Sequence, residues 1–600
     1  MHQTIVINKI PRMNIILRLT KMATCHKWNL ILAYLCMLGA TTSFLITPKF
    51  IGKAVDKISS SYNEGIIPTS LIIETIIAIV LLMSIRGFLS FWQTSLGENL
   101  SHKIAYSLRN MFFNKVQTIS FDFHDRWHTG ELISRAISDI ENVRMSINMG
   151  LMRAPYFLAM FIIVSILLIN LHWLLGIISI AFMPIISLNS INVRLKMRRL
   201  LHKIQKTTAE LSTISQENFS GAKVVRSFAS SKYEQSKFDS KNQEIFYQTV
   251  DAEKLRAKNA TFMRFAFTVS IGIVLLIGGR LVINEELTWG ELTQFIIYMQ
   301  ILSMPVSMAA WLVNAYARAV SSGERLFEIL DSKSKLKETS NTLKINKSNG
   351  HILFKDVSFG YDENNLVLKN LNLEIKTGEK IAIIGPPGSG KTTIANLIPR
   401  FYDVTGGKIL LDNIDIKQIN LNSLRRNIGL IQQDIFLFAT TIKENISYGK
   451  EDATMEEVIQ AAKTAQIHNY IQTLDKGYDT ILGERGTDLS GGQRQRLGIA
   501  RAVILNPSIL IMDDTTSSVD TETETLINQS LESIMKNRTT LIISNRISTV
   551  QKANKIFVLE QGEIIEEGLH QELLEKNGIY KNIYNLQLKP TETQSKNTIK

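Results

Sequence analysis

Cysteine is almost absent from this sequence of 600 residues, which contains only Cys25 and Cys36. Two cysteines cannot build a disulfide framework, and no cluster of Cys and His residues has the spacing of a metal site. The stretch MHQTIVINKIPRMNIILRLTKMATCHK at the start is basic and amphipathic, but it lacks a small-residue cleavage site after its modest apolar part. We therefore expect residues 1–26 to form an interfacial amphipathic helix rather than a signal peptide that is removed.

Acidic residues are fewer than basic ones, 54 against 67, which gives a net charge of +13. A net positive charge alone is weak evidence for nucleic-acid binding. Much of the excess lies in segments that flank long apolar runs, where Lys and Arg mark the cytoplasmic side of a membrane. We therefore expect no nucleic-acid partner and expect contact with a lipid bilayer.

Long apolar runs are concentrated in the first 320 residues. Each run is close to the ~20 residues that cross a bilayer as a helix. The sequence therefore predicts a transmembrane domain of six helices over residues 27–320. The six predicted spans are residues 28–48, 71–96, 154–170, 173–193, 265–283 and 292–314.

The distribution of Lys and Arg among the loops predicts the orientation. Residues 98–144 and 194–264 are rich in both, whereas the turn at 284–290 has acids and no Lys or Arg. The positive-inside rule places the two long segments and both chain ends in the cytoplasm, with a multi-pass domain in the inner (plasma) membrane. The long segments exceed ordinary connectors, and their helical pattern predicts that the membrane helices continue past the bilayer.

Three charged residues, Glu74, Arg86 and Arg280, interrupt the apolar runs. A charge in hydrocarbon is costly, so such groups usually face a bundle interior or the membrane interface. Two interpretations stay open: these side chains lie near headgroups or inside protein, or they contact a transported substrate.

A phosphate-binding motif follows a short strand-like run in the second half of the sequence. GPPGSGKTT comes directly after residues 381–384 and before a helical pattern. In a P-loop, glycines let backbone N–H groups surround phosphate oxygens at a helix N-terminus, while a lysine reaches the β and γ phosphates and a hydroxyl ligates Mg²⁺. The sequence therefore predicts ATP and Mg²⁺ as cofactors. The residues predicted to hold them are Gly385, Pro386, Pro387, Gly388, Ser389, Gly390, Lys391, Thr392 and Thr393.

A second strand-like run ends in two acids, Asp513 and Asp514. Asp513 has the position of the acid that holds Mg²⁺ in P-loop NTPases. Between the two motifs lies LSGGQRQRLGIARA, at 489–502, whose paired glycines open a predicted helix and predict a second anion-binding helix start. One nucleotide does not need two such helix starts, so the second indicates a site that another protein completes.

The order of these motifs resembles the ATP-binding cassette (ABC) transporter family. Six apolar runs ahead of one cassette resemble a half-transporter of the multidrug- or lipid-exporter type, and residues 121–139, 217–238 and 278–299 resemble its two cytoplasmic loops and its turn between spans five and six. The resemblance covers nearly the whole chain. It implies an α-helical membrane domain followed by an α/β P-loop NTPase cassette. It also implies ATP-driven export of a hydrophobic or amphipathic substrate such as a drug, lipid or peptide.

The resemblance also implies roles for single residues. Tyr361 matches an aromatic residue that stacks on adenine, and Gln433 matches a glutamine that meets Mg²⁺ and the attacking water. Asp520 matches an acid in the loop that crosses to the partner cassette. The signature residues would contact the ATP that the partner's P-loop holds; they are Leu489, Ser490, Gly491, Gly492 and Gln493.

Two positions depart from the family pattern. The family usually has Glu after the Mg²⁺ aspartate and His after the following strand, where this chain has Asp514 and Asn545. Aspartate is shorter by one methylene, and a general base must lie within hydrogen-bond reach of the water. Asparagine can bond a γ-phosphate but cannot exchange a proton near neutral pH. Both changes in one site predict a weakened ATP site at this chain's own P-loop.

The intact signature would complete a competent site on a different partner, so we expect a heterodimer of two half-transporters with one degenerate site. One alternative is a homodimer that uses Asp514 as a weak base, and another is an ATP-gated channel or regulatory subunit. The six predicted spans argue against a soluble DNA-repair ATPase, which shares the cassette motifs. We expect a linker over 321–350, the cassette over 351–587 and a disordered polar tail over 588–600.

Overall fold

The computed structural model describes residues 12–63, 69–334, 336, 342–362, 365–514, 527 and 530–588. The chain divides into two compact units. The helical unit contains residues up to 118 and residues 129–332, whereas the α/β unit contains residues 119–128 together with the chain from 333 onward.

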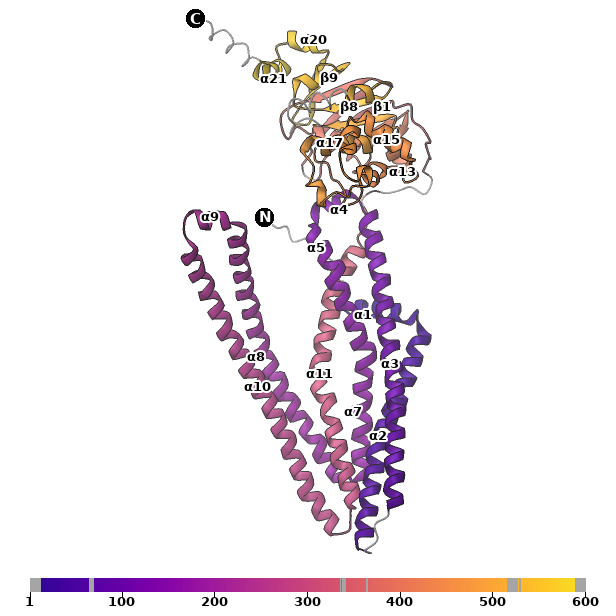
Figure 1. Ribbon diagram of the computed structural model, residues 1–600, viewed down its shortest axis with the longest axis vertical. Helices are drawn as coiled ribbons and strands as arrows, with labels where there is room; N and C mark the ends of the chain where they lie inside the picture. The colour runs from indigo at the N-terminus through magenta and orange to yellow at the C-terminus, as the bar shows by residue number, and fades with distance from the viewer. Residues whose placement is uncertain are drawn as a thin grey trace. The chain divides into compact units, whose positions relative to one another are not determined.

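The helical unit is built from long helices joined by short turns (Figure 1). Helices α3, α8 and α10 have 50, 48 and 53 residues, far more than the ~20 residues that cross a bilayer. The prediction that the helices continue well past their apolar runs is confirmed. The elements of this unit are α1 (Arg12–Thr24), α2 (Lys27–Asn63), α3 (Thr69–Thr118), α5 (Thr129–Ser134), the π-helical η1 (Arg135–Asp139), α6 (Ile140–Ile147), the π-helical η2 (Asn148–Arg153), α7 (Ala154–Leu171), α8 (Trp173–Ser220), α9 (Ala222–Ser227), α10 (Ser231–Ile283) and α11 (Trp289–Leu330).

Five segments of the described chain are long and apolar enough to cross a membrane. Five of the six predicted spans fall on them. The sixth, at 292–314, falls on α11, where the side chains of residues 306, 307, 309 and 310 lie outside the described set, and it stays a prediction. The five segments are Lys27–Ser61, Ile72–Thr118, Thr129–Leu171, Trp173–Ser220 and Ser231–Ile283.

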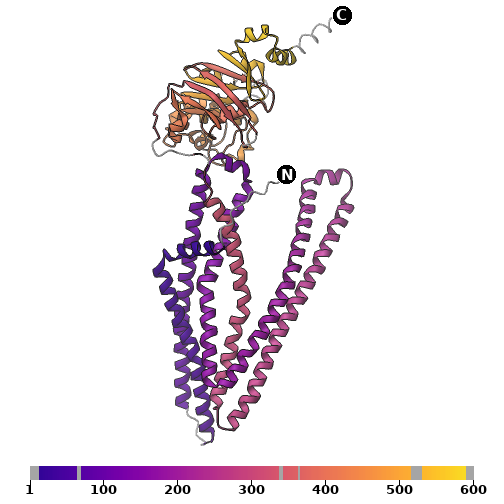
Figure 2. The ribbon, with the colours of Figure 1, turned by 180° about the vertical axis from the view of Figure 1, so that it is seen from behind.

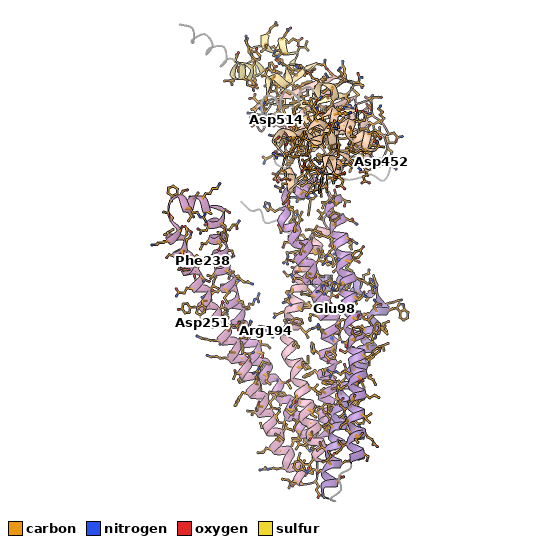
Figure 3. The ribbon with its side chains drawn as sticks, in the orientation of Figure 1. Glu98, Arg194, Phe238, Asp251, Asp452 and Asp514 are labelled. Atoms are coloured by element: carbon orange, nitrogen blue, oxygen red, sulfur yellow. The ribbon has the colours of Figure 1, made fainter. Side chains whose placement is uncertain are left out.

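Helices α8 and α10 lie side by side in a hairpin that α9 closes, and both views show its α9 end apart from the other helices of the unit (Figures 1 and 2). Arg194, Phe238 and Asp251 lie on this hairpin (Figure 3). Two large apolar side chains near the α9 end, Phe219 and Phe228, are 83% and 77% exposed. The hairpin therefore presents apolar surface that the rest of this unit does not cover.

The charged residues within the apolar runs have different surroundings. The Arg86 guanidinium of α3 lies 3.6 Å from the centre of the Phe44 ring of α2, a cation–π contact. Glu74 and Arg280 are exposed; Glu74 lies in the second turn of α3, and Arg280 lies in the last turn of α10. Arg86 therefore packs against a neighbouring helix, whereas both interpretations stay open for Glu74 and Arg280.

The end of α11 is fixed to neighbouring elements by ion pairs at every third residue. Arg325 pairs with the buried Asp139 of η1, Glu328 accepts a hydrogen bond from the buried Arg135 at 2.9 Å, and Asp331 follows the helix and pairs with Arg18 of α1. The helix runs to Leu330, into the predicted linker. The apolar pattern explains this extension, because Leu326, Phe327 and Ile329 remain fully buried.

The α/β unit contains two sheets whose strands are drawn as arrows in Figure 2. The larger has the order β10-β9-β3-β8-β7-β6, and all neighbours except β10 and β9 are parallel. The smaller is antiparallel, with the order β2-β1-β4-β5. The strands are β1 (Ile352–Phe359), β2 (Leu368–Ile375), β3 (Lys380–Ile384), β4 (Gly406–Leu411), β5 (Ile414–Asp415), β6 (Ile428–Ile431), β7 (Ile509–Asp513), β8 (Thr539–Ile543), β9 (Lys555–Glu560) and β10 (Glu563–Gly568).

Both faces of the parallel sheet are buried. On β3, Ile381 and Ile383 belong to one apolar core, while Ala382 and Ile384 belong to the other, because successive side chains of a strand point to opposite faces. The helices of this unit are α4 (Phe121–Arg126), α12 (Lys391–Leu397), η3 (Ile416–Gln418), α13 (Leu421–Arg426), α14 (Ile442–Ser447), α15 (Met455–Thr464), α16 (His468–Gln472), η4 (Gly477–Asp479), η5 (Glu484–Gly486), α17 (Gly491–Val503), α19 (Ile547–Val550), α20 (His570–Glu575) and α21 (Ile579–Leu588). Helix α21 includes Leu588, which the sequence placed in the tail; the rest of the predicted tail lies outside the described residues.

Candidate nucleotide site

Four neighbouring strands of the parallel sheet end in predicted site residues. The P-loop follows β3, Asn545 follows β8, Asp513 ends β7, and Gln433 follows β6. These strands are adjacent and parallel in the order β3-β8-β7-β6, so their carboxyl ends meet at one edge of the sheet, where ligands of open α/β sheets bind. The sheet thus brings together residues that lie up to 160 positions apart in the sequence.

The P-loop glycines occupy positions that exclude a side chain. A Cβ on Gly385 would lie 2.1 Å from the carbonyl oxygen of Leu559, on the neighbouring strand β9. Gly388 and Gly390 have φ angles of +80° and +103°, in the region that residues with side chains rarely adopt. This backbone lets N–H groups approach a phosphate closely at the start of α12.

Lys391 and Ser389 of the P-loop are both buried. The Lys391 ammonium donates to the carbonyl oxygens of Gly385 and Pro386 at 2.8 and 2.9 Å. Burial lowers the pKa of Lys391, while the charges of Asp514 and Asp513 act in the opposite direction. The Ser389 hydroxyl is buried and has no hydrogen-bond partner among the described residues. An anionic ligand that supplies several acceptor oxygens would satisfy both groups, so the residues present fit a nucleotide triphosphate.

The predicted Mg²⁺ ligands lie next to each other. The Thr392 hydroxyl donates to the Asp513 carboxylate at 3.3 Å, and burial raises the pKa of Asp513. No group of three His, Cys, Asp or Glu side chains within the described ranges could hold a metal alone. Thr392 and Asp513 fit a Mg²⁺ ion whose remaining ligands are waters and nucleotide phosphates, as is usual for this ion.

Asp514, which is labelled in Figure 3, directly follows β7 and has an unusual backbone conformation. Its φ angle is +42°, which aspartate tolerates better than most residues. Its N–H donates to the carbonyl oxygen of Ile543, the last residue of β8, at 2.8 Å. One of its carboxylate oxygens is buried with no hydrogen-bond partner among the residues that the structure describes. The carboxylate therefore keeps an acceptor oxygen without a partner among the described residues, and the Asp514 backbone is hydrogen-bonded to Ile543, two residues before Asn545.

The other two predicted catalytic residues, Asn545 and Gln433, are exposed at the same edge. The structure therefore places Asn545, Gln433 and Asp514 at the same edge of the sheet as the P-loop.

An aromatic cluster surrounds the predicted adenine contact. Tyr361 is 43% exposed, and its hydroxyl lies 3.2 Å from that of Thr393. The Tyr361 and Tyr402 rings meet edge to face at 5.2 Å. The Tyr402 hydroxyl donates to Asp125 of α4 at 2.7 Å, and burial together with this bond raises the pKa of Tyr402. The Phe121 ring of α4 lies 4.5 Å from that of Phe401.

The sequence did not single out Tyr402 or Asp125. Residues 121–125 and 401–402 lie about 280 positions apart, and no local periodicity in the sequence reveals that they pair. The contact links the first predicted cytoplasmic loop to the adenine contact through one intervening ring.

The signature begins helix α17, which packs on α14, α15 and β6. Ser490 is the N-cap residue: its hydroxyl accepts from the Gln493 N–H at 3.3 Å, and the Gln493 amide oxygen accepts from the Ser490 N–H at 2.8 Å. This capping box leaves the other N–H groups of the first turn without intrahelical partners. Leu489 is buried and anchors the helix start. Asp520, the predicted contact to a partner cassette, lies outside the described residues.

Comparison with known proteins gives two matches to family models. The model described as ABC transporter transmembrane region matches residues 30–306, and the model described as ABC transporter matches residues 368–517. The first covers the helices that hold the candidate spans. The second contains the P-loop, the signature and Asp513.

Similar proteins match over most of their length. An ATP-dependent lipid A-core flippase from Syntrophus aciditrophicus is 36% identical over 96% of this chain and 95% of its own. An uncharacterized ABC transporter ATP-binding protein from Bacillus subtilis is 39% identical over 85% of this chain and 87% of its own. A Staphylococcus aureus protein that is provisionally named a multidrug export ATP-binding/permease protein is 36% identical over 85% of this chain and 89% of its own.

Proposed function

The chain belongs to the ABC transporter family, and we propose that it is the degenerate-site half of a heterodimeric exporter. Exporters of this type work as dimers in a lipid bilayer. The proposed partner is a second half-transporter, and the proposed substrate is a hydrophobic or amphipathic molecule. The names of the similar proteins, a lipid flippase and a multidrug exporter, support this substrate class.

One observation carries the proposal: the residues that bind nucleotide follow the family pattern, while the two that would activate water do not. Lys391 donates to the Gly385 carbonyl oxygen and Thr392 donates to the Asp513 carboxylate, an arrangement that fits a Mg²⁺–ATP site. Asp514 and Asn545 replace a longer acid and a histidine. Because a displacement of about 1 Å can cost ~10²-fold in rate, the shorter carboxylate is expected to orient the attacking water poorly.

The two halves of the cassette then serve different ATP molecules. The P-loop, with Tyr361 against adenine and Gln433 near the metal, holds this chain's own ATP. A bound Mg²⁺ would neutralise charge that develops on the phosphates during transfer. The signature, from Leu489 to Gln493, would contact the ATP held by the partner's P-loop. The partner site would therefore carry out most of the hydrolysis.

The exposed apolar residues of the α8–α10 hairpin support a dimer. Phe219 and Phe228 lie well beyond the predicted end of the fourth span, at residue 193, so lipid is not expected to cover them. Exposed apolar surface outside the membrane marks protein interaction sites. A second half-transporter is the partner that this family supplies.

The proposed cycle uses ATP to select a conformation. Two ATP molecules would close the paired cassettes, and differential binding of ATP to the closed state would shift the spans from inward to outward opening. Hydrolysis at the partner site would reset them. We propose that the cassettes and both chain ends lie in the cytoplasm and that the spans lie in the plasma membrane, as the positive-inside rule predicts.

A homodimer is the second candidate, because Asp514 is still a carboxylate, and one of its oxygens has no hydrogen-bond partner among the described residues. The two arrangements differ in subunit composition. Two differently tagged copies of this chain would be expressed together with the native partner and extracted in lipid nanodiscs. We expect that the two tags do not co-purify. Co-purification of both tags in stoichiometric amounts would contradict the heterodimer and favour the homodimer.

A further inference from the structure

Helix α21, the last described helix, is fixed to the α/β unit at both of its ends (Figure 1). At its start, the Glu566 carboxylate of β10 accepts from the N–H groups of Ile579 and Tyr580 at 2.6 and 3.3 Å. Tyr580 is fully buried, and its hydroxyl lies 2.7 Å from His570 Nδ1. Glu566 therefore satisfies N–H groups that a helix start leaves without partners, and the helix is docked firmly.

At its other end, α21 reaches the loop that follows β8. The Gln587 side chain makes two hydrogen bonds with the backbone of this loop. Its Nε2 donates to the Asn545 carbonyl oxygen at 2.6 Å, and its Oε1 accepts from the Ile547 N–H at 3.0 Å. One amide group thus holds the residues on both sides of Arg546.

The second of these bonds replaces a missing helix cap. Helix α19 begins at Ile547 and has four residues, and its N-cap residue Arg546 makes no side-chain cap. Gln587 accepts from the first N–H of α19, a group that has no partner within the helix. The loop between Ile543 and Ile547 is so short that fixing Ile547 and the Asn545 carbonyl constrains the conformation of Asn545.

The remaining bonds of this loop connect it to the nucleotide site. The Ser544 N–H donates to the carbonyl oxygen of Ile383 on β3, one residue before the end of the strand that leads into the P-loop. The Ser544 hydroxyl accepts from the Arg546 N–H at 3.1 Å. The loop is therefore fixed to the P-loop strand on one side and to α21 on the other, with Asn545 between them.

We infer that Gln587 is a positioning residue for the nucleotide site: it holds the loop so that the Asn545 side chain is presented to the terminal phosphate of ATP. This role rests on the proposed nucleotide site of this chain. Gln587 acts through Asn545, which is proposed to contact the γ-phosphate. Replacing Gln587 should therefore lower the affinity for ATP and leave the affinity for ADP, which has no γ-phosphate, unchanged. A purely structural role would change both affinities together.

The test is the affinity of the full-length chain in lipid nanodiscs for ATP and for ADP, each with Mg²⁺. Removing two hydrogen bonds to the loop in Gln587→Ala is expected to weaken ATP binding about three- to tenfold and to leave ADP binding unchanged. Gln587→Glu keeps the acceptor for Ile547 but loses the donor to Asn545, and it should behave like Gln587→Ala. Leu586→Ala, at the adjacent 78% exposed position, is the matched control and should match the wild type.

A double-variant cycle separates positioning from folding. In an Asn545→Ala background, Gln587→Ala should have no further effect on ATP binding, because the side chain that it positions is gone. Three results would each overturn the role of Gln587. Gln587→Ala could weaken ATP binding and ADP binding equally, it could leave ATP binding unchanged, or it could weaken ATP binding as much in the Asn545→Ala background as in the wild type. ATP binding that does not depend on Lys391 would overturn the proposed nucleotide site itself, and with it this role.

Discussion

Replacing Ser490 with alanine is expected to lower ATP turnover of the complete transporter about 10²-fold, the loss typical of removing one donor from a charged transition state. The complex would be purified from its native membrane through a tag on this chain. Ser490 caps α17 and, in the proposed dimer, faces the phosphates of the partner's ATP. By the same account, Asp514→Ala should leave most of the turnover intact, because this chain's own site contributes little.

The control for Ser490→Ala is Thr454→Ala. Thr454 forms an equivalent capping box with Glu457 at the start of α15, so both variants lose a cap that contributes about 1 kcal/mol to stability. Equal losses of turnover in the two variants would show that the signature acts through folding. A large loss in Asp514→Ala would instead indicate that this chain's own site hydrolyses ATP.

The second large effect is a gain of activity. In the Ser490→Ala complex, Asp514→Glu combined with Asn545→His is expected to raise turnover at least about tenfold, because a carboxylate placed about 1 Å closer to the water can recover up to ~10²-fold. The β7 and β8 ends already hold these positions close together, through the bond from the Asp514 N–H to Ile543. Turnover would be measured as phosphate release at saturating Mg²⁺–ATP.

A matched double variant isolates the contribution of the carboxylate to this gain. Asp514→Asn combined with Asn545→His retains the histidine but has no carboxylate, and it should not raise turnover, because an amide cannot act as a general base. If the Glu and His pair leaves turnover at the level of Ser490→Ala alone, these two residues do not account for the weak site.

Much of the nucleotide site could be predicted from the sequence because its parts are local motifs. The P-loop needs glycines at special backbone positions, and the positive φ angles of Gly388 and Gly390 confirm that reason for their presence. Asp513 was identifiable because an apolar run ends in acids. The long helices were identifiable because each carries an apolar run of membrane length, preceded or followed by a helical pattern of charged residues.

The remaining features depend on tertiary contacts that leave no periodic signal. Strand order β3-β8-β7-β6 places Gln433 and Asn545 at one sheet edge, and no spacing in the sequence specifies that order. The Tyr402–Asp125 bond and the two bonds of Gln587 each join residues that are far apart in the sequence. The continuation of α11 into the predicted linker was missed because residues 321–350 are charged and polar as a whole. In the structure, two of these charged residues, Arg325 and Glu328, form ion pairs with buried residues of η1.

The most direct measurement of the central claim is ATP turnover by this chain purified alone in lipid, with Lys391→Ala as the control. We predict turnover no greater than that of Lys391→Ala, together with Mg²⁺–ATP binding that Lys391→Ala abolishes. That result would mean that the chain holds nucleotide and needs a different half-transporter for hydrolysis. Robust turnover that depends on Lys391 would mean that Asp514 serves as a base in a homodimer, and it would contradict the degenerate-site account.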